Sequence, residues 1–290
     1  MKPTIIIGTV IALLMFALFV IKGVVAVGAW LVLKLILPFI ALFVLLVVGV
    51  LVLIQKLRNK PLNRMKTGVF AALNVILVLP LLLTLNVVPI AFPTNVNKVQ
   101  PSLAIASPFE VPSIVAWGGN KFKDNVPHAM WGNERWAYDL VMDVYNTGSK
   151  VLDDYGVWGV DVYAPVTGTV VAAYDAEPDI TPNTEDFVSI EGNHLYIKVA
   201  ETGTFLLLNH LQQDSIVVKI GDVVKVGDLL AKVGNSGSTS EPHLHIHHQR
   251  EDPRTTVHIL LAEGLPLYFK TKDDKKMLTR GTELLGQQID

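Results

Sequence analysis

The chain has 290 residues, and its apolar residues are concentrated in the first third. This length suffices for a membrane region and one further domain. With 24 basic and 26 acidic residues the formal net charge is −2, so the charge gives no indication of a nucleic-acid partner. The absence of cysteine excludes disulfide bonds and thiolate metal sites, and any metal ion would need histidine, aspartate or glutamate ligands.

Residues 1–92 contain three apolar stretches that suit membrane-spanning helices, which need about 20 apolar residues each. The candidates are residues 4–21, 35–54 and 68–92, with two spans as the alternative to three. The short apolar stretch 23–33 is interpreted as a re-entrant turn or as part of a shifted first span. The lipid bilayer is therefore an expected partner. A membrane-protein partner stays open, because Asn74 and Asn86 in the third stretch could bond to another helix or face a neighbouring span.

Basic residues between the second and third stretches predict the orientation in the membrane. Five of them lie in this connection without an acidic residue among them: Lys56, Arg58, Lys60, Arg64 and Lys66. Lysine and arginine accumulate in short cytoplasmic loops. We therefore expect a multi-pass protein of the cell membrane, with everything after Pro93 on the extracytoplasmic side. A cleaved signal peptide is not expected, because further apolar stretches follow the first one.

The remainder of the chain divides into a linker, one domain and a tail. Residues 93–110 contain several prolines and are predicted to be a linker. Residues 111–270 lack long segments with helical periodicity, and residues 194–199 and 205–211 flank a turn that indicates a hairpin. The predicted fold class is N-terminal transmembrane α-helices followed by an all-β domain with an antiparallel sheet. Residues 271–290 form a polar tail without a functional signal.

Four polar residues stand beside apolar runs that are predicted to be strands. His243 and His245 are two positions apart, and on a strand such side chains share one face. Two neighbouring imidazoles can begin a zinc site, although a merely polar strand face is an equally good interpretation. Asp139 and His210 taken alone would be strand-end residues facing water. Together the four residues suit a metal site built on the rigid strands of a sheet.

The motifs of this domain follow one another in a distinctive order. They are Asp139, Ala-Pro-x-x-Gly-x-Val at 164–170, His210-Leu211, two Gly-Asp pairs within 221–228, Gly-Asn-Ser-Gly at 234–237 and Pro-His-Leu-His at 242–245. This order resembles the lysostaphin-like zinc endopeptidases of bacterial cell walls. The resemblance implies a bound Zn²⁺ ion and peptidoglycan peptides as the substrate. It assigns Asp139 and His245 as zinc ligands, and His210 and His243 as unliganded histidines near the metal-bound water.

The chain departs from this family at one position. The family has its first metal-binding histidine four residues before the aspartate, where this chain has Arg135, whose guanidinium stays protonated and cannot bind zinc. A catalytic zinc ion generally has three protein ligands and a water molecule. His128 is the best substitute ligand, against the alternative of a surface-loop histidine without a role. His247, on the strand face of His243 and His245, is a second substitute. The remaining histidines are expected at the surface or at strand ends: His194, His248 and His258.

The leading hypothesis is a zinc metalloendopeptidase in which His128, Asp139 and His245 hold the ion, and His243 or His210 acts as general base. A second hypothesis is a degenerate, non-catalytic binding module in an envelope complex, because Arg135 removes one ligand. A third is a carrier or sugar-transport domain, since residues 220–233 resemble carrier hairpins. A carrier would need a lysine at the hairpin tip, where this chain has Gly-Asp turns.

Overall fold

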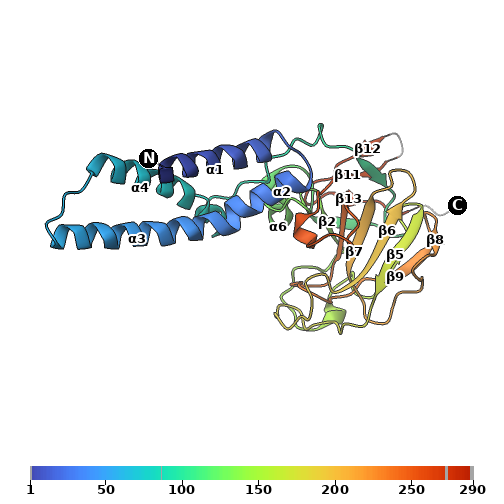
Figure 1. Cartoon of the computed structure of the whole chain (residues 1–290). Coiled ribbons are helices and arrows are strands. Elements are labelled where there is room, and N and C mark those ends of the chain that lie inside the picture. Colours follow the sequence, from blue (N-terminus) through green and yellow to red (C-terminus); the bar gives the residue numbers. More distant parts are fainter. Residues whose placement is uncertain (1, 86, 272–273, 288–290) are drawn as a thin grey trace. The chain divides into compact units, whose positions relative to one another are not determined.

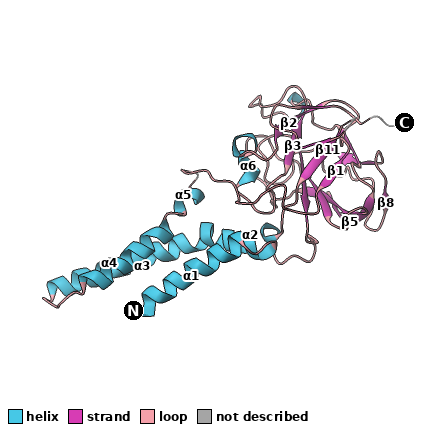
Figure 2. Cartoon of the chain, turned by 90° about the horizontal axis from the view of Figure 1, so that it is seen from above, coloured by secondary structure: helices cyan, strands magenta, loops and turns pink. Residues whose placement is uncertain are grey.

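The structure is a computed structural model that describes residues 2–85, 87–271 and 274–287. It divides into two compact units, Met1–Pro93 and Thr94–Asp290. The first unit is helical, whereas strands and loops dominate the second, as the colours of Figure 2 show. The predicted order of N-terminal apolar helices followed by a mainly antiparallel β domain is therefore confirmed.

The N-terminal unit contains two helices that are long and apolar enough to cross a membrane, among the described residues. One runs through Val24–Leu57 and the other through Arg64–Thr84, while a further apolar helix, Pro3–Phe19, is shorter. Apolar side chains cover their outer surfaces, as suits contact with lipid. The elements are α1 (Lys2–Phe19), α2 (Val24–Leu31), a π-helical turn (Val32–Ile36), α3 (Leu37–Leu57), α4 (Arg64–Val78) and α5 (Leu81–Thr84) (Figure 1).

The interpretation of residues 23–33 as a re-entrant turn or as part of the first span was wrong. Gly23 has a φ of 71°, which separates α1 from α2, and the helix that begins at Val24 continues to Leu57. Pro38 removes a backbone donor early in α3, and the π-helical turn precedes it without ending the helix. Asn74 donates its side-chain amide to the carbonyl of Phe70 within its own helix. Asn86 lies outside the described residues.

The C-terminal unit contains an eight-stranded sheet in the order β13-β2-β3-β10-β7-β6-β5-β8, and every strand pair in it is antiparallel. The predicted hairpin is confirmed by the pairing of β6 with β7. The strands are β2 (Ser113–Trp117), β3 (Tyr138–Val141), β5 (Gly168–Tyr174), β6 (Asn193–Val199), β7 (Phe205–Leu211), β8 (Val223–Val224), β10 (Leu244–Gln249) and β13 (Glu283–Leu284) (Figure 1).

Two smaller sheets complete the unit. In one, β1 (Leu103–Ile105) pairs in parallel with β11 (Leu267–Lys270), which pairs with β12 (Lys275–Lys276). In the other, β4 (Asp161–Tyr163) pairs with β9 (Leu229–Lys232). The segment predicted to be a linker thus contributes β1, and the segment predicted to be a tail contributes β12 and β13.

Alternating side chains along β10 separate the apolar core from the polar face of the sheet. Leu244 and Ile246 are fully buried in a cluster that includes Leu206 and Leu208 of β7. Burying each such side chain contributes about 1.5–3 kcal/mol, so the register of β10 is strongly fixed. A shift of one residue would exchange these leucine and isoleucine side chains with histidines. The core therefore also fixes the face on which His245 lies.

Candidate metal centre

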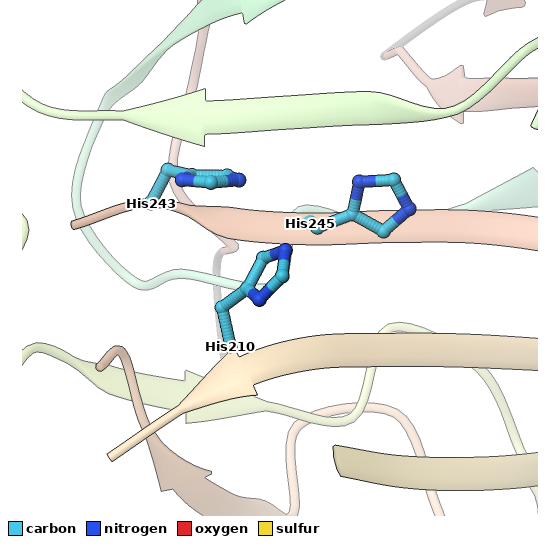
Figure 3. A group of neighbouring side chains, drawn as sticks. All are labelled: His210, His243 and His245. Atoms are coloured by element: carbon cyan, nitrogen blue, oxygen red, sulfur yellow. The ribbon is translucent and has the colours of Figure 1, made fainter. Parts of the chain in front are cut away.

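Strand register places Asp139, His245 and Asn209 in one row across the sheet. Asp139 of β3 lies opposite His245 of β10, and His245 lies opposite Asn209 of β7. Directly opposed residues in antiparallel strands project to the same face. His243 precedes β10 and shares this face with His245, and Figure 3 shows both rings along one strand.

His210 joins the same group although strict alternation would separate it from its neighbour Asn209. Its φ of 62° lies in the left-handed region, which a histidine rarely occupies and which breaks the extended geometry near the end of β7. The ring of His210 lies with its centroid 4.9 Å from that of His243 and 5.8 Å from that of His245 (Figure 3). Strained backbone of this kind is concentrated at functional sites.

The Oδ1 atom of Asp139 is the point on which three histidines converge. It lies 3.0 Å from Nδ1 of His245, 3.4 Å from Nε2 of His128 and 3.5 Å from Nε2 of His243. Asp139, His128 and His245 are all buried. The residues proposed from the sequence as metal ligands therefore meet at one oxygen atom, from segments far apart in the chain.

A buried asparagine determines which nitrogen of His128 carries the proton. The Nδ2 amide of Asn125 donates to the carbonyl oxygen of Ala137 at 3.1 Å, so its Oδ1 atom is left to accept. This Oδ1 lies 2.8 Å from Nδ1 of His128, which must donate to it. In a neutral imidazole the other nitrogen is then an acceptor. Nε2 of His128 thus directs a lone pair towards Asp139.

Backbone carbonyls determine the same tautomer for His210 and His243. The Nδ1–H of His210 donates to the carbonyl of Ser236, and the Nδ1–H of His243 donates to the carbonyl of Glu241, both at 2.8 Å. Each Nε2 is therefore an acceptor in the neutral ring. One nitrogen from each of His210, His243 and His245 lies within 4.8 Å of the other two.

His128 and His243 direct their Nε2 atoms towards the Asp139 carboxylate, and this arrangement fits a metal ion. The Oδ1 atom of Asn209, in the same row, is also buried and has no hydrogen-bond partner among the described residues. Acceptors this close repel one another unless a proton or a cation lies between them. Imidazole nitrogens and carboxylate oxygens are the ligands that zinc takes in a protein without cysteine. The side chains present can therefore bind a divalent ion such as zinc.

The pKa values follow from the same geometry. Burial lowers the pKa of His128, but the Asp139 carboxylate outweighs it and the net shift is upward. Burial raises the pKa of Asp139, but His128 and His243 outweigh it and hold this pKa well below its usual range. Burial lowers the pKa values of His210 and His243, so both rings are neutral near pH 7.

Residues 152–256 match the sequence model of peptidase family M23. The chain therefore contains an M23 peptidase domain. The matched segment includes His210, His243 and His245, whereas His128 and Asp139 precede it. The resemblance to lysostaphin-like peptidases that the motifs predicted is confirmed by this match.

Several solved structures are similar to the chain. One is a Pseudomonas aeruginosa protein assigned to peptidase M23, with 20% identity over 52% of this chain and 48% of that chain (TM-score 0.30). A second is the catalytic domain of lysostaphin from Staphylococcus simulans, with 19% identity over 52% of this chain and 86% of that chain (TM-score 0.31). A third is a zinc-containing peptidase from Vibrio cholerae, with 21% identity over 51% of this chain and 37% of that chain (TM-score 0.31). The chain spans half or less of the Pseudomonas and Vibrio proteins. No curated protein matches the sequence.

Paired glycines in the M23 domain hold the carbonyl that orients His210. Gly237 has a φ of 79°, and a Cβ atom there would lie 2.4 Å from the backbone nitrogen of Gly192. Gly192 has a φ of 62°, and a Cβ atom there would lie 2.3 Å from the carbonyl oxygen of Ser236. Only glycine suits both positions. The Gly-Asn-Ser-Gly motif therefore brings Ser236 against His210.

The other positions singled out in the sequence lie around this centre. Arg135 is buried and donates to the carbonyl of Asn120 at 2.8 Å, and burial lowers its pKa to about 10, so it stays charged near neutral pH. His247 is also buried, with Nδ1 3.0 Å from Nε2 of His245, on the side of that ring away from Asp139. His247 is thus placed behind a proposed ligand, and His128 is placed beside Asp139.

The three remaining histidines have structural contacts. His194 stacks on Tyr196 at a centroid distance of 4.4 Å, and His258 accepts a hydrogen bond from the backbone of Leu260. The expectation that His248 is a surface or strand-end residue was wrong. It is only 1% exposed, and its Nε2 lies 2.6 Å from Oγ1 of Thr204, because it faces the opposite side of β10 from His247.

Glu134 was not identified from the sequence, yet it lines the cleft at the centre. One of its carboxylate oxygens lies within 4.8 Å of a ring nitrogen of His128 and of His245. It directly precedes Arg135, in a segment without strand or helix periodicity, so no pattern indicated it. The cleft has a volume of about 320 Å³, and its walls include both polar side chains and the apolar residues Trp117, Ile259 and Leu260.

Proposed function

We propose that this protein is a membrane-anchored zinc metalloendopeptidase that hydrolyses peptide bonds in cell-wall peptidoglycan. The observation that carries the proposal is the convergence of His128, His243 and His245 on the Asp139 carboxylate, in a chain whose residues 152–256 match the M23 peptidases. His128, Asp139 and His245 are the proposed zinc ligands. His210 and His243 are the proposed catalytic residues.

A bound zinc ion would polarise the scissile carbonyl and lower the pKa of an attacking water molecule. His210 and His243 are neutral near pH 7 because burial lowers their pKa values, so Nε2 of either ring can accept a proton from that water. The Nδ1–H groups donate to backbone carbonyls, which hold both rings in place and stabilise the protonated form. The proton can then pass to the leaving amine.

For the location, we propose a multi-pass membrane protein with the M23 domain on the extracytoplasmic side. The helices Val24–Leu57 and Arg64–Thr84 can cross the membrane, and the basic connection between them suits the cytoplasmic side. In this orientation the chain after the second of these helices emerges on the same side as the cell wall. The bilayer then holds the cleft near its proposed substrate.

The second candidate function is a non-catalytic binding module in an envelope complex. Arg135 favours it, because this residue stands where the related peptidases have a ligand. The position of His128 favours the peptidase, since its Nε2 atom lies 3.4 Å from Asp139, where it is the proposed third ligand. The two candidates differ in zinc content and in peptide cleavage.

The test uses the full chain purified in detergent. Zinc would be measured by elemental analysis, and cleavage of peptidoglycan peptides would be followed before chelation, after chelation and after zinc is returned. The proposal predicts bound zinc and cleavage that chelation abolishes and zinc restores. His245→Ala should lose both properties, whereas His194→Ala, which changes a partly buried ring outside the cleft, should keep both. Wild-type protein that cleaves no peptidoglycan peptide would support the binding module, and protein that binds no zinc would end the metal proposal.

A further inference from the structure

A chain of buried side chains runs behind His245 along one face of β10. Nε2 of His245 lies 3.0 Å from Nδ1 of His247, and Nε2 of His247 lies 3.2 Å from Oε1 of Gln249. The Nε2 amide of Gln249 donates to the carbonyl oxygen of Glu251 at 2.7 Å. The three side chains occupy positions i, i+2 and i+4 of the strand, so each lies beside the next.

The direction of every hydrogen bond in this chain is set by its last member. The Glu251 carbonyl can only accept, so Gln249 presents its NH₂ group there and its Oε1 towards His247. Oε1 can only accept, so Nε2 of His247 donates and Nδ1 of a neutral His247 accepts. Nε2 of His245 must therefore donate to His247. The remaining nitrogen of a neutral His245, Nδ1, is left with a lone pair.

This lone pair is the one that faces Asp139, at 3.0 Å from its carboxylate oxygen. We propose that His247 and Gln249 are positioning residues that hold His245 in the tautomer and orientation needed to bind the metal ion through Nδ1. The inference rests on the proposed metal site. It gives His247 a role different from that of a substitute ligand, and it explains two further polar residues of the His-Leu-His-Ile-His-His-Gln segment.

Burial shields the hydrogen bonds behind His245 from water. His247 is 1% exposed and Gln249 is fully buried, so water does not readily replace either partner. An unsatisfied polar group at such depth is costly, and each hydrogen bond polarises its neighbours. The other proposed histidine ligand has a shorter version of the same device, because Asn125 fixes the tautomer of His128 directly. Partners of this kind behind metal-binding histidines commonly change metal affinity by about 10–100-fold when they are removed.

The experiment measures zinc affinity of the full chain in detergent by competition with a chelator, without reference to cleavage. His247→Leu removes the acceptor and should weaken zinc binding by about 10–100-fold. His247→Asn can place Oδ1 near the position of the histidine Nδ1 and should recover much of the loss. Gln249→Met removes the hydrogen bond to Nε2 of His247, one residue further from the metal site, and should weaken zinc binding less. His248→Leu is the matched control. His248 is an equally buried histidine of β10 that makes no hydrogen bond to His245, His247 or Gln249, and its replacement should leave zinc affinity unchanged.

A second readout does not depend on affinity. With ¹⁵N-labelled histidine in the zinc-loaded protein, NMR should show Nε2 of His245 protonated and hydrogen-bonded, and its proton should exchange faster in His247→Leu. Zinc affinity of His247→Leu equal to that of wild type, or lowered equally by His248→Leu, would overturn the positioning role while leaving the metal site intact. Wild-type protein without zinc affinity would instead refute the proposed function on which this inference rests.

Discussion

The two proposed histidine ligands are held by very different parts of the molecule. His245 lies in the middle of β10, where register with β3 and β7 and an apolar opposite face fix its position. His128 lies in α6 (Val126–Ala129), a four-residue helix in an irregular segment, where Asn125 orients its ring. The strand ligand follows from a repeating pattern, whereas the helix ligand depends on one local hydrogen bond. The centre therefore has a rigid half on β10 and a variable half in the irregular segment, where one local hydrogen bond orients the ligand.

The variable half is also where the chain departs from the related peptidases. Arg135, at the expected ligand position, donates to Asn120 and lies in the same irregular segment as His128. A strand position cannot be moved without shifting a whole register, because one step reverses the face of every side chain. A short helix before the strand can supply a ligand from a different point in the sequence. This difference explains physically how a ligand could be replaced while Asp139 and His245 stay in place.

The largest expected effect comes from the residue that joins the two halves. Asp139→Asn removes the negative charge on which His128 and His245 converge, and it should reduce bound zinc to an undetectable level in elemental analysis of the full chain. The matched control is Asp161→Asn, which breaks a surface ion pair with Lys232 and should leave zinc content unchanged. Zinc binding by Asp139→Asn at the wild-type level would refute a centre built on this carboxylate.

The comparison between the two halves also explains which features could be predicted from the sequence. The i, i+2 spacing of His243 and His245 predicted one strand face. In the structure His245 lies opposite Asp139 in the strand register, and Nε2 of His243 lies 3.5 Å from the Asp139 carboxylate. His128 could be proposed only as a substitute for the missing ligand and from the family resemblance, because no periodicity indicates where a four-residue helix places a side chain. Glu134 could not be proposed at all for the same reason.

Long-range contacts account for the other differences. Leu284 in the predicted tail pairs with Ser113 of β2, and Leu103 in the predicted linker pairs with Leu267 of β11. Such short strands carry too few residues for an alternating pattern, and they form only because a partner strand is already in place. The burial of His248 has a similar origin, since Thr204 and Pro266 enclose it from distant segments.

A second prediction tests whether the helix half depends on one hydrogen bond. Asn125→Ala removes the acceptor that fixes the tautomer of His128, and zinc affinity should fall by about 10–100-fold. Zinc affinity should fall further in His128→Ala, because this substitution removes the proposed ligand itself. Affinities would be measured by chelator competition, with Asn183→Ala on the surface as the control. If Asn125→Ala leaves zinc affinity unchanged, the short helix holds His128 by some other means and the contrast between the halves weakens.

A third prediction concerns the orientation of His210, a proposed catalytic residue, which should be disturbed without loss of metal binding. Gly237→Ala would bring a Cβ atom within 2.4 Å of Gly192 and would strain a backbone with a φ of 79°, so the Ser236 carbonyl should move away from His210. Cleavage should fall by at least about tenfold with zinc content retained, and stability by about 1–3 kcal/mol. Gly203→Ala is the control, because its φ is 71° and nothing lies within 4 Å of the added atom. Equal losses of cleavage in both variants would assign the effect to backbone strain alone.

The smallest expected effect concerns His248, which lies on the core side of β10, away from the proposed metal site. Burial lowers the pKa of His248 to about 3, while in the unfolded chain it is near 6.5. Between these values the unfolded state binds the additional proton, so this residue lowers stability as the pH falls through that window, by up to about 1.4 kcal/mol per pH unit.

His248→Asn can keep the donor to Pro266, and it should make the loss of stability between pH 6.5 and pH 5 smaller by about 2 kcal/mol. Urea unfolding of the metal-free protein, followed by tryptophan fluorescence, measures this difference. An unchanged pH dependence would mean that His248 is protonated in the folded protein, and the core face of β10 would then be less closed to water than its burial indicates.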